Sequence, residues 1–110
     1  MSNGNIISWI EEWYYSQCDG EWEHDYGVKI GTLDNPGWSL KVNLKGTSKE
    51  SAKESKIEIE RNENDWIHCF VRGTRYEAFG GPKNLHELLS IFKDWIVSGE
   101  DKGLDTLINT

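Results

Sequence analysis

The hydrophobic residues of this chain follow a helical period near both ends and a strand period in between. In residues 5–17 the large apolar side chains recur every three or four positions, which predicts an amphipathic helix: Ile6, Ile10, Trp13 and Tyr14. We expect Asn5 or Asn3 to cap this helix and Asp19-Gly20 to end it. A second helix is predicted from Asn84 to about residue 97, with Glu87 completing a capping box.

Between the helices, apolar and polar residues alternate in segments that predict strands: residues 26–33, 38–45, 56–61, 66–72 and 75–79. Turn residues separate most of these segments, so consecutive strands are expected to pair antiparallel in hairpin succession. The two helices offer the only apolar surfaces that can cover one face of the sheet. The prediction is an α+β fold, with a single twisted antiparallel sheet of about five strands and both helices on one face.

Two segments lack apolar periodicity. Residues 46–55 are predicted to be a mobile surface loop, and residues 99–110 a polar tail that frays or lies against the domain. The length of 110 residues suits one domain, with a core of about residues 5–98. Five of the six tryptophans fall on or beside apolar stripes and are expected in the core: Trp9, Trp13, Trp38, Trp66 and Trp95.

Charge is distributed unevenly along the chain. The 19 acidic and 12 basic residues give a net charge of −7, which argues against binding to nucleic acids or anionic membranes. Residues 11–25 contain six acidic and no basic residues, whereas residues 26–110 contain 13 acidic and 12 basic ones. Almost the whole imbalance therefore lies in one short segment, where Trp22 stands between Glu21 and Glu23.

This segment is predicted to form an acidic recognition surface for a basic partner, with Trp22 as its anchor. The predicted contact residues are Asp19, Glu21, Trp22, Glu23, His24, Asp25 and Tyr26. A structural reading remains open, in which the loop is merely solvated and Trp22 folds onto the sheet edge. Partner choice would then rest with residues 46–55 or with exposed sheet residues such as Lys41 and Asn43.

Catalytic and metal chemistry are less well supported by the sequence. His68-Cys69, separated by five residues from Arg75, matches the spacing of a tyrosine phosphatase phosphate loop, but a strand cannot wrap its amides around a phosphate. We expect Cys69 to be a small buried hydrophobic residue. The acidic segment lacks the spacing of a calcium loop, so no metal or cofactor is expected. The competing hypothesis is a thiol-dependent enzyme, sulfurtransferase-like or phosphatase-like, that uses Cys69 or Cys18.

Several segments resemble the immunity protein 53 family. The longest runs from Trp13 to Ile30 and contains the specific run Cys-Asp-Gly-Glu-Trp-Glu-His at residues 18–24. Shorter matches are Thr32–Ser39, Asn64–Cys69 and Gly80–Leu85, and together the matches cover most of residues 9–97.

The resemblance implies a small bacterial protein of the cytoplasm that binds and neutralises a cognate polymorphic toxin. It implies no catalytic residue, because the family is defined by inhibition. Many such toxins are nucleases, so an acidic surface would suit their basic substrate grooves. The expected partner is a toxin domain, with no nucleic acid or membrane, and the chain is expected to be a monomer or a weak dimer. The absence of an N-terminal signal pattern agrees with a cytoplasmic location.

Overall fold

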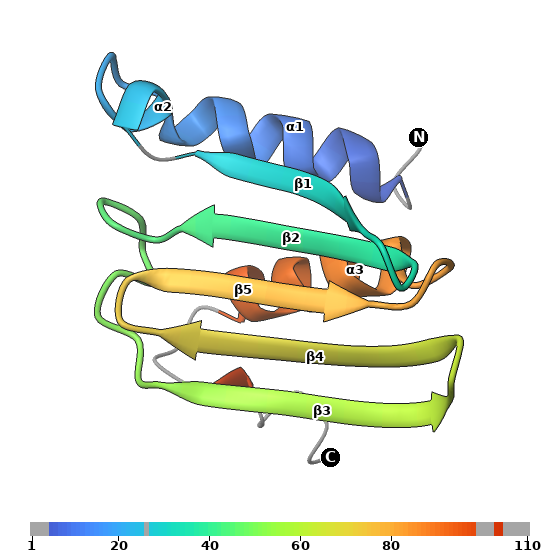
Figure 1. Cartoon of the computed structure of the whole chain (residues 1–110). Coiled ribbons are helices and arrows are strands. Elements are labelled where there is room, and N and C mark those ends of the chain that lie inside the picture. Colours follow the sequence, from blue (N-terminus) through green and yellow to red (C-terminus); the bar gives the residue numbers. More distant parts are fainter. Residues whose placement is uncertain (1–4, 26, 99–102, 105–110) are drawn as a thin grey trace.

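The computed structural model describes residues 5–25, 27–98, 103 and 104, and it contains one five-stranded sheet with helices on one side (Figure 1). The elements in chain order are α1 (Ile6–Gln17), α2 (Trp22–Asp25), β1 (Val28–Leu33), β2 (Gly37–Asn43), β3 (Ser55–Asn62), β4 (Asp65–Arg72), β5 (Arg75–Gly80) and α3 (Leu85–Val97). The predicted α+β class is confirmed. The short helix α2 was not predicted, because four residues are too few to show a helical period.

The strands pair antiparallel throughout, in the order β1-β2-β5-β4-β3. The prediction that consecutive strands form hairpins is therefore correct for three of the four connections and wrong for the connection from β2 to β3. The chain leaves β2, crosses the end of the sheet and begins β3 at the opposite edge, so that β5 later fills the place beside β2 (Figure 1). Residues 44–54 make this crossing, and their length permits it because longer loops add little closure entropy.

Local sequence explains where the elements begin and turn. The Asn5 carboxamide oxygen accepts hydrogen bonds from the backbone N–H of Ile7 at 2.9 Å and of Ser8 at 3.2 Å, which caps α1. The β4–β5 hairpin turns at Gly73, whose φ of 57° lies in the left-handed region that glycine adopts without strain.

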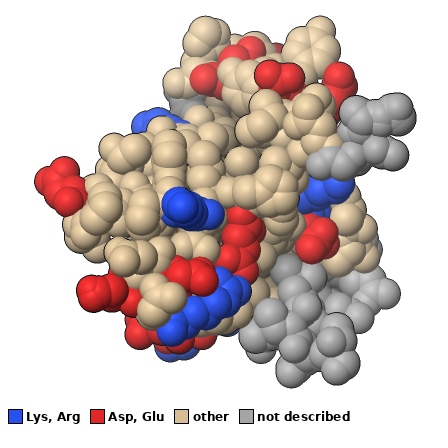
Figure 2. All heavy atoms as spheres, turned by 90° about the vertical axis from the view of Figure 1, so that its right-hand side faces the viewer, with Lys and Arg blue, Asp and Glu red and all other residues tan. Residues whose placement is uncertain are grey.

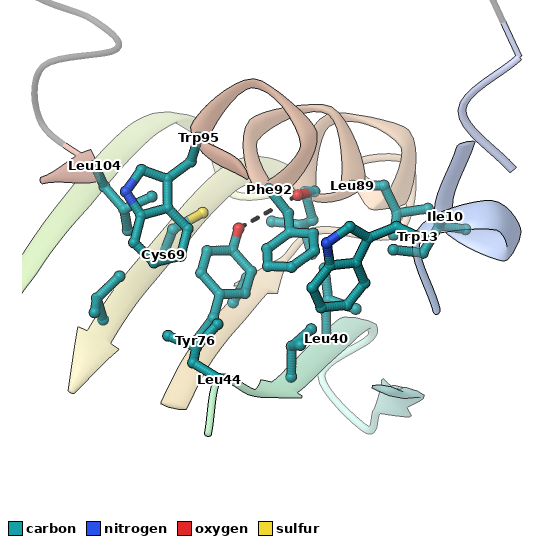
Figure 3. Packing of buried hydrophobic residues seen from close by; sticks show 14 of the residues in the cluster. Ile10, Trp13, Leu40, Leu44, Cys69, Tyr76, Leu89, Phe92, Trp95 and Leu104 are labelled. Carbon is teal, nitrogen blue, oxygen red and sulfur yellow. Dashed lines mark hydrogen bonds between the residues drawn. The ribbon is translucent and has the colours of Figure 1, made fainter. Parts of the chain in front are cut away.

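The core lies between the sheet and the two long helices (Figure 3). At its centre the ring of Phe92 on α3 contacts Trp13 of α1, with centroids 5.0 Å apart, and Tyr76 of β5, with centroids 4.9 Å apart. The Tyr76 hydroxyl donates to the Leu88 carbonyl at 3.3 Å, so the polar end of this buried ring is paired. Trp95, with no exposed surface, stacks on Tyr76. These contacts tie both helices to the same face of the sheet.

The loop of residues 46–55 is anchored, which corrects the prediction of a mobile segment without buried contacts. The Lys49 side chain is buried, and its ammonium donates to the Ser98 hydroxyl at 3.1 Å and lies 5.3 Å from the centre of the Trp95 ring. The described part of the tail is anchored as well. Leu104 is fully buried, and its backbone N–H donates to the Ser55 hydroxyl at 2.9 Å. A single lysine carries no periodicity, so pattern analysis missed the contacts of Lys49, whereas Leu104 follows the predicted alternative in which the tail lies against the domain.

Asn84 begins α3 as predicted, but the capping box does not form. No capping hydrogen bond is made by its side chain, which is buried and joins three segments instead. Its carboxamide oxygen accepts from Gly81 at 3.1 Å and Trp66 at 3.3 Å, and its NH₂ group donates to Asp65 at 3.0 Å and Glu87 at 3.1 Å. Asn84 therefore links the start of α3 to the β3–β4 turn and to the loop after β5.

We predict that Asn84→Ala lowers the free energy of unfolding by about 2–3 kcal/mol, because it removes the four hydrogen bonds of a buried side chain. The matched control is Asn62→Ala, which removes the exposed hydrogen bond to the Asn64 N–H at 2.8 Å and should cost less than about 1 kcal/mol. Urea denaturation followed by tryptophan fluorescence measures both. Equal losses in the two variants would contradict a linking role for Asn84.

Candidate functional site

The acidic segment folds into a tight turn between α1 and α2 that uses two of its own carboxylates. Asp19 accepts hydrogen bonds from the backbone N–H groups of Glu21 and Trp22, each at 2.9 Å. Glu23 reaches back and accepts from the N–H groups of Asp19 and Gly20, also at 2.9 Å. Asp19 therefore caps the short helix, and the pair of carboxylates closes the turn from both sides.

These hydrogen bonds lower the pKa of both carboxyl groups. The N–H groups of Trp22 and Glu21 lower the pKa of Asp19, and backbone N–H groups of Glu23 itself, Asp19 and Gly20 lower that of Glu23. A carboxyl group with a lowered pKa in the folded state stabilises the fold while it is ionised. This contribution is present above the ordinary pKa values of 3.8 and 4.5 and is lost as the pH falls through the lowered ones.

Trp22, predicted as the anchor of the recognition surface, is buried. Its side chain is only 3% exposed and packs on Trp13, with ring centroids 5.9 Å apart, and on Tyr14, at 5.8 Å. The alternative, in which the side chain folds inward, is the one observed, and the ring joins the buried cluster between α1 and the sheet. Helix α2 explains the difference, because its first residue points toward the apolar side of α1 while Glu21 and His24 stay exposed. Asp25 ends α2, and Tyr26 lies outside the described residues.

An acidic surface with exposed aromatic residues nevertheless exists, and α1 supplies most of it. Tyr15 is 77% exposed and Tyr14 39%, and both lie one helical turn from exposed carboxylates. Figure 2 shows acidic side chains over the top of the molecule, where α1 lies in Figure 1. We call this region the acidic helix surface: Ile7, Glu11, Glu12, Tyr14, Tyr15 and Glu21. Residues 5–25 contain no lysine or arginine that could neutralise it.

The second exposed feature is the sheet face that no helix covers, which we call the open face. Its centre is a row of half-buried rings with neighbouring centroids 5.2 to 6.5 Å apart: Trp66, His68, Phe70 and Phe79. The prediction of Trp66 as a core residue is wrong, because it alternates with Ile67 and so points away from the helices. Both faces of β4 are apolar, and the sequence alone does not say which one the helices cover.

A broad open depression of about 720 Å³ lies beside this aromatic row, lined by residues that include Leu33, Trp66, His68 and Phe79. His68 pairs with Glu60 across it, with Nε2 and Oε2 2.9 Å apart. At its rim, Arg61 is held by both Glu87 oxygens, at 2.7 and 3.1 Å, and by Asp65 at 2.8 Å. The depression is therefore lined by both aromatic and charged side chains, a combination that suits contact with another protein.

Cys69 does not have the surroundings of a nucleophile. Cys69 has no exposed surface, and burial raises the pKa of its thiol to about 11. It lies within β4, so the spacing from His68 to Arg75 spans a hairpin and not a phosphate loop. Cys18 is partly exposed, and its Sγ contacts the Tyr14 carbonyl at 3.3 Å. The expectation that Cys69 is a small buried hydrophobic residue is confirmed.

We predict that iodoacetamide at pH 8 modifies Cys18 and leaves Cys69 intact in the folded protein. Burial raises the pKa of the Cys69 thiol well above that pH and leaves it no exposed surface for the reagent to reach. Peptide mass spectrometry with and without urea distinguishes the two sites. Rapid labelling of Cys69 without denaturant would revive the thiol-enzyme hypothesis.

Among the residues that the structure describes, no three potential metal-binding side chains gather in one place. The helices in the same part of the chain are too short or too polar to cross a membrane.

Comparison with known proteins identifies the family. The family model for immunity protein 53 matches residues 7–97, which run from the second residue of α1 to the end of α3. The chain belongs to the immunity protein 53 family. Curated proteins and solved structures give no significant match. As an immunity protein, it has another protein, a toxin, as its implied partner, and the family favours a role without catalysis.

Proposed function

We propose that this immunity protein neutralises a cognate toxin domain by binding to it through the acidic helix surface. One observation carries the proposal: Tyr14 and Tyr15 stand exposed among carboxylates in a stretch of the chain without a lysine or arginine. Exposed tyrosines suit an interface, because each offers a large contact area at a small cost in conformational entropy. The surrounding carboxylates favour a basic partner and speed its association.

A nuclease toxin is the partner class that fits this surface best. Its substrate groove must attract phosphates and is therefore basic. Carboxylates on α1 and α2 would occupy that groove in place of phosphates, and the tyrosines would cover its apolar walls. Inhibition would then need only occupancy, without a bond being made or broken. We place this action in the bacterial cytoplasm, where the producing cell needs protection.

The predicted segment 19–26 contains both proposed contact residues and positioning residues. Glu21 and His24 are exposed and remain proposed contacts. Asp19 and Glu23 hold the turn through their hydrogen bonds, and Trp22 fixes α2 against α1. Asp25 and Tyr26 keep their proposed contact role from their place in the sequence.

The experiment is co-expression with the toxin domain encoded beside this chain. We expect the intact chain to restore growth and to co-purify with the toxin domain in a stable complex. A Cys18→Ser, Cys69→Ala double variant should rescue equally, provided that it folds, because no thiol chemistry is involved. Failure of the intact chain to bind or to rescue would overturn the proposal. Rescue that needs a cysteine while binding persists would favour the enzyme alternative.

A further inference from the structure

One corner of the open face collects positive charge in a protein whose net charge is −7. Four basic residues lie there, on four neighbouring strands: Lys29, Lys41, Arg72 and Arg75. We call them the basic corner. Each basic residue has a neighbour in its strand that points toward the helices, and these neighbours pair across the strands: Val28, Val42, Tyr76 and Val71. Because side chains alternate along a strand, all four basic residues belong to the face opposite the helices.

The register places like charges directly opposite each other. Lys29 is the cross-strand partner of Lys41, and Arg75 is the partner of Arg72. Such pairs destabilise a sheet. The four residues lie in two neighbouring cross-strand rows of the sheet. In the described part of these rows the one carboxylate is Glu77, the cross-strand partner of Lys41. No ion pair within 4 Å joins these four cations to a carboxylate in the described ranges, and Arg72 lies 4.4 Å from the centre of the Phe70 ring.

The basic corner continues directly from the acidic segment. Its depression, of about 270 Å³, is lined by Lys29, Lys41, Arg75 and by Gly27, which follows α2 by two residues. The Gly27 carbonyl accepts a hydrogen bond from Asn43 at the end of β2, which fixes this junction. In Figure 1, α2 and the ends of the strands that carry the corner lie at the same left-hand side of the molecule.

We propose that the basic corner is the second half of the toxin-binding surface and that it takes carboxylates of the toxin domain. The inference rests on the proposed function and adds to it the chemistry that the partner must present. A sheet that accepts two like-charge pairs gains from an anionic partner that relieves them. Since the corner adjoins the acidic segment, the toxin must carry an acidic patch beside its basic one. The neighbouring rings of Phe70 and Phe79 would supply the apolar contact between them.

The test is the double variant Lys29→Gln, Arg75→Gln, which removes the charge of one member of each like-charge pair and leaves a polar side chain in its place. We expect its affinity for the toxin domain to fall by about tenfold or more. Its melting temperature should be equal to or higher than that of the unchanged chain, because two repulsions are removed. If the two residues had a purely structural role, replacing them would lower the melting temperature instead. The control, Lys83→Gln, Lys93→Gln, changes the net charge equally at sites away from the open face and should bind normally.

The outcomes separate the two proposals. If the intact chain does not bind the toxin domain at all, the proposed function fails. If the toxin binds and the double variant retains full affinity, the basic corner is not part of the interface. If the variant keeps toxin affinity but loses binding of a single-stranded oligonucleotide that the intact chain binds, the corner is a nucleic-acid site and the inference is wrong. Should the double variant not fold, Arg75→Gln alone provides the same comparison.

Discussion

Replacing Trp22 by alanine is expected to lower the free energy of unfolding by about 3–5 kcal/mol, the usual cost of removing a buried aromatic ring. The ring is 3% exposed and lies against both Trp13 and Tyr14, so its loss leaves a cavity between α2 and α1. Without this contact, α2 would also lose its position relative to the acidic helix surface. Urea denaturation gives the change in stability.

The control is Trp22→Phe. The Trp22 indole N–H is buried and has no hydrogen-bond partner among the described residues, so phenylalanine removes an unsatisfied donor along with some packing. We expect a loss below about 2 kcal/mol and unchanged toxin affinity. An alanine variant with normal stability but weak toxin binding would instead restore Trp22 as an interface anchor.

Reversing two charges of the acidic helix surface, Glu11→Lys with Glu21→Lys, is expected to weaken toxin binding by about a hundredfold or more at low salt. Both residues are exposed, and close charge pairs at protein interfaces are worth ~1.5–7 kcal/mol of coupling. Added salt should reduce the difference between the variant and the intact chain, because screening weakens exposed charge pairs. Calorimetry or surface plasmon resonance at two ionic strengths measures the effect.

The variant avoids Glu23, which accepts two backbone hydrogen bonds and whose reversal would disturb the turn as well as the charge. A matched control, Glu63→Lys with Asp94→Lys, makes the same change in net charge at exposed positions away from α1. If both variants lost affinity equally, the effect would come from net charge alone. If the Glu11/Glu21 variant kept full affinity, the acidic helix surface would not be part of the toxin interface.

Periodicity predicted the fold well because the core depends on it. Ile6, Ile10 and Trp13 recur on α1, and Leu40 alternates with exposed Lys41 on β2, so the buried side of each element is visible in the sequence. The sheet order was not predictable in the same way. Antiparallel pairing of β2 with β5 depends on where a long connection places the chain, and residues 44–54 contain no signal for this.

The candidate site was only partly predictable, for a related reason. Composition located the acidic segment, but it did not distinguish a carboxylate that caps a turn, such as Asp19, from one that faces solvent, such as Glu21. The burial of Trp22 was not predictable either, because it depends on α2, a helix that is too short to detect from periodicity. The basic corner was not predictable as a cluster, because only the strand order, with β5 between β2 and β4, brings the Lys29–Lys41 pair beside the Arg72–Arg75 pair.

We propose that this immunity protein acts by occupying its toxin. The most direct measurement is the activity of the purified toxin domain titrated with increasing amounts of this chain. We expect the toxin activity to fall in proportion to the added protein and to reach zero at one chain per toxin domain. The activity should return when the complex is separated. Complete and lasting inactivation by a small fraction of an equivalent, growing with time of incubation, would mean turnover and would contradict this proposal.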